Sequence, residues 1–221
     1  MTLALYTYPL ALNGVKVELL LAEADTACRV HHVDLPRREH LSDGCTARNP
    51  LGRLPFIDHD GFVLAESGAI LRYLATLLGR EDWYPVAPRE RACVEQWMDF
   101  VAAHVNAALG ALYVSRWFAM RHGWSMDLFG VERSLRDVAR DLPILESQLS
   151  RTEYLAGPRP TLADLSLLPF LAVVELVGLR IRDPYPRLAR WRDGMTARPS
   201  WTSLAGRWSG AAPVRARGSA R

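Results

Sequence analysis

The fold of this chain is most easily read from residues 49 to 74, NPLGRLPFIDHDGFVLAESGAILRYL. In this segment Leu54-Pro55 comes directly before a strand-like run. A proline there removes one hydrogen-bond donor from a sheet ladder and suits a sheet edge or a cis turn. Two short strand-like runs, 56–58 and 62–65, then flank a His-Asp-Gly turn. The segment therefore predicts a β-hairpin that is entered through a proline.

A helix follows this hairpin at Glu66-Ser67. Apolar side chains recur at helical spacing along residues 67–78, and Gly79 ends the pattern. The apolar side consists of Ile70, Leu71, Leu74 and Leu77. Ser67 is placed to cap the helix, and the free N–H groups beside it suit a carboxylate. We therefore expect an anion to bind where the hairpin meets the helix.

Upstream of the hairpin, strand-like and helix-like runs alternate. Residues 3–8 and 28–35 are strand-like, residues 15–23 are helical, and a polar loop leads to the hairpin. The order β-α-β-β-α predicts an α/β domain with a mixed sheet. Ligands gather at strand-to-helix turns in open α/β sheets, yet residues 9–17 contain no Ser, Thr, Cys, His or Tyr. A catalytic group at this turn must therefore be of another kind.

Downstream of the hairpin, the pattern is helical throughout. The expected helices span 89–122, 128–149, 161–177 and 186–196, with a short one near Trp201. Thr161 and Asp164 have the spacing of a capping box, with Asp in place of the stronger Glu or Gln. The longest apolar run, 162–179, is interrupted by charges and a proline, so it predicts a buried core helix rather than a membrane span.

The domain organisation follows from these two secondary-structure patterns. We expect an α/β domain at 1–79, a linker at 80–88, a helical domain at 89–208 and a disordered tail at 209–221. The linker is rich in charged and turn residues, and prolines break its helical continuity. No internal repeat is present.

Composition excludes several classes of function. The chain has 221 residues, 49% hydrophobic and 23% charged, as in ordinary globular proteins. A net charge of +3 gives no reason to expect nucleic acid or a membrane as partner. Lys16 is the only lysine among 27 basic residues, a skew that we attribute to codon usage in a GC-rich genome. Three cysteines without CxxC spacing and no signal-peptide pattern predict a cytoplasmic protein without a disulfide framework.

Taken together, these motifs resemble the glutathione transferase family over about residues 1 to 208. That family has an Asn-Pro-x-Gly-x-[Val/Leu]-Pro loop and then a Glu-Ser pair that opens a helix. Here they are Asn49, Pro50, Gly52, Leu54 and Pro55, then Glu66 and Ser67. The Gly157, Thr161 and Asp164 segment resembles the capped helix of the family's second domain. The resemblance implies a thioredoxin-like N-terminal domain followed by an all-α domain.

The resemblance also implies how glutathione is held. The backbone of Leu54, turned outward by a cis Pro55, would pair with the cysteinyl residue of glutathione. Glu66 and Ser67 would hold the γ-glutamyl end. His40 and Arg53 would meet the glycine carboxylate; the alternatives are a solvated loop for His40 and a plain surface charge for Arg53.

The group that manages the glutathione sulfur departs from the common pattern. Family members usually place Tyr, Ser or Cys near the end of the first strand, and Ala11 stands here where a Ser would be. Asn13-Gly14-x-Lys16 is similar to a theta- or nu-like bacterial branch that uses Asn, with Thr7 as the expected helper. The spacing after Pro9 is one residue longer than in that branch. The alternative is that Asn13 and Gly14 only shape the turn.

A substrate pocket is expected between the two domains. Tyr113, Arg116, Trp117 and Met120 share one helical face at i, i+3, i+4 and i+7. Leu10 and Ala11 would face them from the first turn. The alternative is that this face belongs to the core.

The predicted function is that of a glutathione S-transferase. It would be a homodimeric enzyme that uses the glutathione thiolate on a small hydrophobic electrophile, without a metal and with a role typical of detoxification. Conjugation, peroxide reduction, isomerisation and ether cleavage in a specialised pathway are not separated by the sequence. The alternative is a non-catalytic interaction or ligand-binding module with the same fold.

Overall fold

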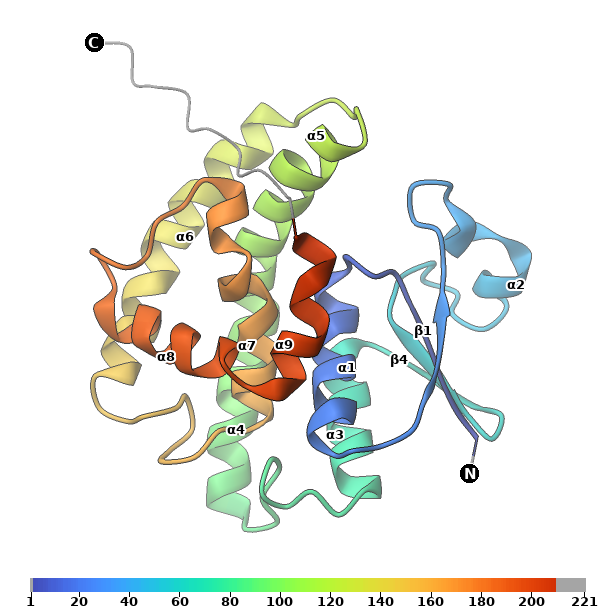
Figure 1. Cartoon of the computed structure of the whole chain (residues 1–221), viewed down its shortest axis with the longest axis horizontal. Coiled ribbons are helices and arrows are strands. Elements are labelled where there is room, and N and C mark those ends of the chain that lie inside the picture. Colours follow the sequence, from blue (N-terminus) through green and yellow to red (C-terminus); the bar gives the residue numbers. More distant parts are fainter. Residues whose placement is uncertain (1, 210–221) are drawn as a thin grey trace.

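The computed structural model describes residues 2–209 and consists of a small α/β part beside a larger helical part (Figure 1). The predicted disordered tail, apart from Ser209, lies outside the described residues. The family fold expected from the sequence, a thioredoxin-like domain followed by an all-α domain, is confirmed. The exact domain boundaries remain a prediction.

The sheet has four strands in the order β2-β1-β3-β4. Its strands are β1 (Leu3–Thr7), β2 (Arg29–His32), β3 (Phe56–His59) and β4 (Phe62–Ala65). The β1 strand runs parallel to β2 and antiparallel to β3, so that Leu5 lies opposite both Val30 and Ile57. The mixed sheet is therefore confirmed, although β1 and β2 are shorter than the sequence predicts.

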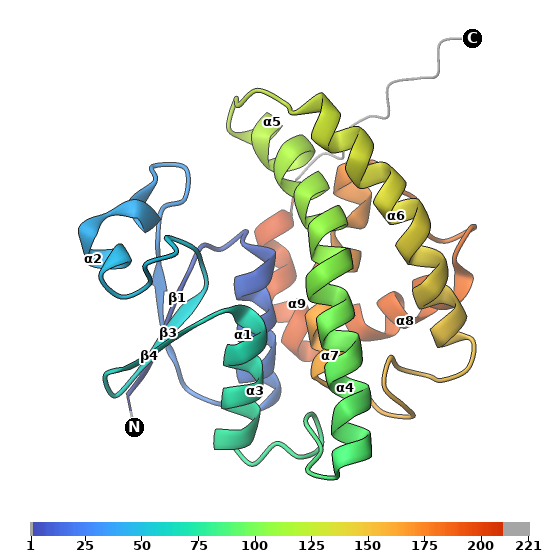
Figure 2. The same cartoon turned by 180° about the vertical axis from the view of Figure 1, so that it is seen from behind.

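Two helices separate this sheet from the helical part. Figures 1 and 2 show α1 (Leu12–Glu23) and α3 (Ser67–Leu77) on that side, with α2 (Asp43–Thr46) on the opposite side. A short 3-10 helix, η1 (Glu39–Leu41), precedes α2. Because α1 packs against the sheet, α3 and the helical part, it is buried around most of its circumference. Most of the buried positions of α1 are therefore apolar, and the buried polar residues Lys16 and Glu18 are exceptions.

The helical part begins at residue 88. Its elements are α4 (Pro88–Phe100), η2 (Val101–Gly110), η3 (Tyr113–Phe118), α5 (Ala119–Arg121), α6 (Leu128–Leu149), α7 (Leu162–Ala172), η4 (Val174–Val177), α8 (Pro186–Thr196), α9 (Pro199–Ala205) and η5 (Gly206–Trp208). The α7 helix is central, and residues 162–171 are all buried. Within residues 2–209, no helix is both long and apolar enough to cross a membrane.

The long helix expected at 89–122 has a different backbone from the one predicted. After α4, both η2 and η3 are π-helical, with hydrogen bonds from residue i to i+5. The wider turns change the set of residues that share one face, although the i, i+4 pair of Tyr113 and Trp117 still stacks. Gly110 fits this segment because a Cβ there would lie 2.6 Å from Asn106 Oδ1.

The segment 80–88, predicted as a linker, is anchored rather than free. Trp83 and Tyr84 are buried, and the Trp83 carbonyl accepts a hydrogen bond from the Leu162 N–H at 3.0 Å. The Arg198 guanidinium lies over the Trp83 ring. The connection thus packs against the start of α7 as part of the core.

The capping box predicted at the start of α7 is present. The Asp164 carboxylate accepts from the Thr161 N–H at 2.9 Å and from the Thr161 hydroxyl at 3.0 Å. It also accepts from the Leu155 N–H at 3.1 Å and from the Trp191 indole N–H at 2.9 Å. A single buried carboxylate therefore fixes α7, the preceding loop and α8 to one another.

Candidate functional site

A cavity of about 720 Å³ lies between the α/β part and the helical part. From the α/β part it is lined by Leu10, Ala11, Leu12, Asn13, Leu35, His40, Arg53 and Leu54. From the helical part it is lined by Asn106, Ala107, Gly110, Ala111, Tyr113, Val114, Phe118, Trp124 and Phe170. The first set supplies most of the polar groups, and the second set is mainly apolar.

The turn between β1 and α1 forms one wall of this cavity. The Ala11 N–H donates to the Tyr8 carbonyl at 2.9 Å, and the Gly14 N–H donates to the Ala11 carbonyl at 2.8 Å. Within the described chain, the N–H groups of Leu12 and Asn13 have no hydrogen-bond partner, as is usual in the first turn of a helix. This wall therefore offers backbone donors to an anion.

Three buried side-chain atoms in residues 2–209 have no hydrogen-bond partner, and all three lie at or beside this cavity. They are Asn13 Oδ1, His40 Nδ1 and His122 Nε2. Asn13 and His40 line the cavity, and the His122 ring contacts Phe118, which also lines it. A buried polar atom without a partner is costly, so such atoms collect where a ligand supplies the missing bond.

The loop that carries the motif at 49–55 owes its shape to a buried asparagine. The Asn49 side chain donates to the Arg53 carbonyl at 2.7 Å and accepts from the Leu51 N–H at 3.3 Å. Gly52 has φ 56°, and a Cβ there would lie 2.7 Å from the Leu41 side chain, so glycine is required. The Leu54-Pro55 peptide is cis.

The backbone of Leu54 is exposed to the cavity as a hydrogen-bonding edge. Neither its N–H nor its carbonyl is bonded to another group in the part of the chain that the structure describes. Leu54 lines the cavity, while Pro55 is buried behind it. An extended peptide has the donors and acceptors needed to pair with such an edge.

The start of α3 differs from the prediction in one respect. Ser67 is the first residue of the helix, whereas Glu66 occupies the cap position without a capping side-chain bond. The cap prediction for Ser67 is therefore wrong by one residue, because Glu66 makes the turn with φ 67° and ψ 113°. A non-glycine residue there stores local strain, a condition frequent at ligand sites. Glu66 is exposed and Ser67 is partly exposed, but neither lines the cavity itself.

Lys16 is a buried charged group that the site assignment from sequence left out. Its side chain extends from α1 into the protein interior, with the ammonium 4.8 Å from the centroid of the Phe170 ring. Burial lowers its pKa from 10.5 to about 7, and the Glu66 carboxylate opposes this shift. Lys16 could have been found from the sequence, because it is the only lysine and ends the Asn13-Gly14-Val15-Lys16 motif. No sequence pattern pointed to Phe170 on α7.

Thr7, the expected helper of Asn13, is not in the cavity wall. It is fully buried, and its hydroxyl lies against Gly14, where a Cβ would come within 1.8 Å of it. The hydroxyl donates to the Tyr8 carbonyl at 3.4 Å. Because β1 ends at Thr7, this side chain points into the packing between β1 and α1 instead of the turn.

The four residues expected on one helical face do not all reach the cavity. Tyr113 lines the cavity, but Arg116, Trp117 and Met120 do not. Trp117 is buried and stacks on Tyr113 with ring centroids 5.0 Å apart, while Met120 is 52% exposed. The i, i+4 contact between Tyr113 and Trp117 is kept in η3, and the burial of Trp117 agrees with the alternative that this face belongs to the core.

An aromatic cluster, not recognised from the sequence, forms the far end of the cavity. Phe118 and Trp124 line it with ring centroids 5.5 Å apart, and the Tyr8 ring meets Phe118 edge-on. The His122 ring lies 4.4 Å from Phe118. Burial, together with the neighbouring Arg121 charge, lowers the pKa of His122, so this ring is neutral at pH 7. The cluster suits a flat apolar group.

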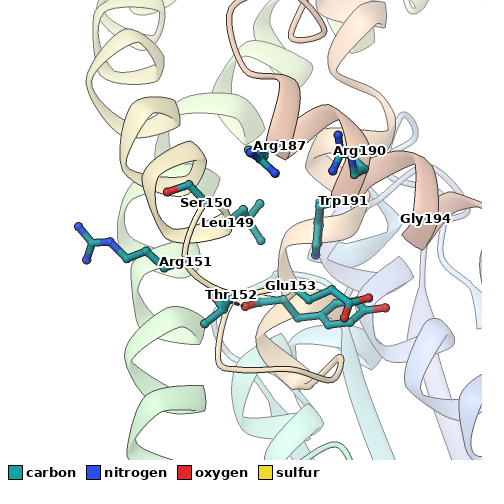
Figure 3. A pocket seen from close by; sticks show the side chains of 10 residues that line it. Leu149, Ser150, Arg151, Thr152, Glu153, Arg187, Arg190, Trp191 and Gly194 are labelled. Atoms are coloured by element: carbon teal, nitrogen blue, oxygen red, sulfur yellow. Dashed lines mark hydrogen bonds between the residues drawn. The ribbon is translucent and has the colours of Figure 1, made fainter.

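A second hollow, of about 420 Å³, lies on the helical part (Figure 3). Figure 3 shows Arg187 and Arg190 along one side and Glu153 on the other, with Trp191 between them. These three charged residues and Arg151, which also lines the hollow, are exposed, and none of the atoms without a partner belongs to a residue that lines it. The interdomain cavity is therefore the better candidate site.

Comparison with known families gives matches in both parts of the chain. Residues 1–76 match the family described as "Glutathione S-transferase, N-terminal domain". Residues 129–194 match the family described as "Glutathione S-transferase, C-terminal domain".

Individual relatives match over most of the chain. Glutathione S-transferase F10 of Arabidopsis thaliana is 31% identical over 214 residues, which cover 95% of this chain and 99% of the relative. Glutathione S-transferase theta-1 of Mus musculus is 32% identical over 177 residues, which cover 76% and 72%. The crystal structure of glutathione transferase URE2P6 from Phanerochaete chrysosporium, in complex with oxidized glutathione, superposes with a TM-score of 0.83 at 26% identity, covering 96% and 98% of the two chains.

Proposed function

This chain belongs to the glutathione S-transferase family, and from that premise we propose that it binds glutathione in the interdomain cavity and uses its thiolate on a small hydrophobic electrophile. One observation carries the proposal. The buried polar atoms without a partner in residues 2–209 gather at a cavity whose wall also presents unbonded N–H groups of a helix N-terminus. Glutathione, an anionic peptide with a thiol, supplies complementary groups.

Glutathione would lie along the wall contributed by the α/β part. Its cysteinyl residue would pair with the free backbone edge of Leu54, and its glycine carboxylate would meet His40 and Arg53. The γ-glutamyl end would extend to Glu66 and Ser67, where the first turn of α3 offers N–H donors. Burial and the Arg38 charge lower the pKa of His40, so a neutral imidazole would serve as hydrogen-bond donor there.

The sulfur would lie at the turn before α1, and Asn13 is the side chain that we propose to steady it. An asparagine amide cannot take up the thiol proton, but its NH₂ group donates to a thiolate. The unbonded N–H groups of Leu12 and Asn13 add the partial positive charge of a helix N-terminus. Thr7 is not part of this proposal because its hydroxyl is buried against Gly14.

The electrophile would occupy the part of the cavity contributed by the helical part. Tyr113, Phe118 and Trp124 line it, and a flat apolar molecule fits their rings. With the thiolate at the opposite wall, the geometry supports attack of sulfur on this molecule, which is conjugation. Peroxide reduction, isomerisation and ether cleavage would use the same thiolate.

Retention on immobilised glutathione and thiolate absorbance together test the function. We expect the protein to be retained, and the ultraviolet absorbance of bound glutathione at pH 7 to reveal a substantial thiolate fraction. A protein that binds glutathione but leaves its thiol protonated would instead be the non-catalytic ligand-binding module. A protein that is not retained would contradict glutathione binding altogether.

Ser67→Ala should weaken glutathione binding by about 1.5–3 kcal/mol, the usual worth of a hydrogen bond to a charged group. The reason is that Ser67 opens α3 and would donate to the γ-glutamyl carboxylate. Titration calorimetry of both proteins measures the difference. Thr76→Ala is the matched control, because it removes an exposed hydroxyl from the same helix that bonds only to the Arg72 carbonyl. Unchanged affinity in Ser67→Ala would remove this residue from the site.

Asn13→Ala should raise the pKa of the bound glutathione thiol by roughly one to two units, since one charge-assisted hydrogen bond to the thiolate is lost. Glutathione affinity should fall little, because the peptide contacts remain. Ultraviolet titration of the complexes gives both values. Asn106→Ala removes an amide from the opposite wall and should keep the wild-type pKa. If Asn13→Ala also keeps it, the asparagine only shapes the turn.

We also propose that the protein is a homodimer, and measuring its mass in solution tests this. Closed two-fold dimers are the commonest oligomers, and the family resemblance implies one. Light scattering at micromolar concentrations should give a mass near twice the 24.8 kDa of the chain. A mass that stays at the monomer value would contradict the dimer.

Two finer expectations stay predictions. One is the cytoplasm as the site of action. The other is a bacterial theta- or nu-like type within the family, since plant transferases stand beside the theta enzymes among the relatives.

A further inference from the structure

The C-terminal segment, residues 198–208, packs against α1. Figure 1 shows α9 beside α1, and two arginine–glutamate pairs join the segment to α1. Arg198 donates from Nε and Nη2 to the Glu23 carboxylate at 2.7 Å each. Arg207 donates from Nη1 to Glu18 Oε1 at 2.8 Å and from Nη2 to Glu18 Oε2. Both arginines bind their carboxylate in a bidentate manner, but the two pairs lie at different distances from the turn that precedes α1.

Only the second pair reaches the proposed thiolate turn. Arg207 Nη1 also donates to the Pro9 carbonyl at 3.3 Å. The neighbouring carbonyl, that of Leu10, accepts from the Tyr113 hydroxyl at 3.1 Å, and the same hydroxyl accepts from the Trp208 indole N–H at 3.1 Å. Two successive carbonyls of the turn are therefore held by the helical part of the chain. We call Arg207, Trp208 and Tyr113 the C-terminal clasp.

We propose that the C-terminal clasp orients this turn so that the Leu10 N–H, and not the Pro9 carbonyl oxygen, faces the sulfur. Arg207 and Trp208 would thus be positioning residues for the thiolate. The inference rests on the proposed function, because it concerns the same glutathione sulfur. It adds that residues more than 190 positions away in the sequence set the donor geometry of the turn.

Peptide geometry supports this role. In a trans peptide the carbonyl and the N–H point in opposite directions, so the bond from Arg207 to the Pro9 carbonyl turns the Leu10 N–H away from the clasp. That N–H has no hydrogen-bond partner within residues 2–209, and Leu10 lines the cavity. If the Pro9 carbonyl were released, rotation of this peptide would bring its oxygen toward the sulfur, whereas the next peptide is also held by the Ala11 N–H bond to the Tyr8 carbonyl. A carbonyl oxygen repels a thiolate, whereas an N–H stabilises it.

The effect acts through the backbone rather than through the charge of Arg207. The Glu18 carboxylate, 8% exposed, neutralises the guanidinium at close range, so the pair carries no net charge. Trp208 and the Tyr113 hydroxyl are uncharged, because burial raises the pKa of Tyr113. A test must therefore remove the bond to Pro9 without changing the net charge near the sulfur.

Two double variants meet that requirement. Arg207→Met with Glu18→Met removes one pair together with the bond to the Pro9 carbonyl. Arg198→Met with Glu23→Met removes the other pair, together with the bond from the Ser200 hydroxyl to Glu23, and leaves the turn untouched. Each variant loses one positive charge, one negative charge and one arginine–glutamate pair between α1 and the C-terminal segment. Trp208→Phe is a milder third variant that removes the indole N–H and keeps an aromatic ring against Trp201.

Hydrogen exchange of the free protein measures the hold on the turn without any glutathione. We expect the hydrogen-bonded amides of Ala11 and Gly14 to exchange about tenfold faster in the Arg207/Glu18 variant and to be unchanged in the Arg198/Glu23 variant. Trp208→Phe should give a smaller increase. Equal exchange in the two double variants would overturn the proposed hold on the turn.

The pKa of bound glutathione then measures the consequence for chemistry. We expect the Arg207/Glu18 variant to raise the thiol pKa by about half a unit to one unit and to shift the acid limb of the kcat/KM profile equally. The Arg198/Glu23 variant should keep the wild-type profile. If both double variants shift the profile alike, the clasp is merely structural and the inference fails. If the wild-type protein itself leaves the thiol pKa unshifted, the proposed function fails, and the exchange measurement alone decides whether the clasp holds the turn.

Discussion

Replacing Asp164 by alanine should lower the free energy of unfolding by about 3–5 kcal/mol. The carboxylate is fully buried and accepts hydrogen bonds from Leu155, Thr161 and Trp191. Alanine would remove the acceptor of two backbone N–H groups, one indole N–H and the Thr161 hydroxyl. Each such donor costs about 1–3 kcal/mol, and the costs are not fully additive because the loop can relax.

Urea denaturation followed by circular dichroism, at one protein concentration, measures this loss. Asp127→Ala is the matched control, since Asp127 also caps a helix, α6, but is exposed and accepts only from the Gly130 N–H at 2.9 Å. That control should cost about 1 kcal/mol. Asp164→Asn keeps one acceptor oxygen and should lie between the two. Similar losses for the two alanine variants would show that burial of the Asp164 network adds nothing.

The buried ammonium of Lys16 should make the protein more stable at pH 9 than at pH 7. Burial lowers its pKa from 10.5 to about 7 in the folded protein, while the unfolded chain keeps the ordinary value. Between these two values the unfolded chain binds more protons, so the free energy of unfolding rises with pH. The contribution of this one group between pH 7 and pH 9 is about 2 kcal/mol.

The same experiment with Lys16→Met isolates this contribution. The variant should lack the rise, and at pH 7 it should be at least as stable as the wild type, because no charge is buried. Since Lys16 is the only lysine of the chain, ¹³C-lysine labelling gives one side-chain resonance whose titration reports the pKa directly. If this resonance titrates near pH 10, burial does not lower the pKa of Lys16 and the prediction is wrong.

The fold could be predicted from sequence because its signals are local. Leu54-Pro55 and the hairpin after it predicted part of the sheet. The spacing of Thr161 and Asp164 predicted the start of α7. The ends of the predicted strands and helices were less accurate: β1 stops at Thr7, and α1 begins at Leu12, three residues before its predicted start. There the turn is shaped by contacts with the helical part, which no local pattern records.

The site was only partly predictable for a related reason. Asn13, His40, Arg53 and Leu54 were named from the sequence, and the structure gathers them around one cavity. Phe170 lies more than 150 residues from Asn13 in the sequence, and the aromatic end of the cavity depends on a backbone form that composition does not reveal. Long-range packing and helix type therefore set the limits of the sequence analysis.

The π-helical segments, Val101–Gly110 and Tyr113–Phe118, have an evolutionary consequence. Wider turns hold more residues, so deletion of one residue inside such a segment can restore an α-helical turn without breaking the helix. Every side chain beyond the deletion would then rotate about the helix axis and present a different set of residues to the electrophile. Length changes in this stretch would therefore alter substrate preference in larger steps than point substitutions, and an alignment of its homologues should place its gaps there.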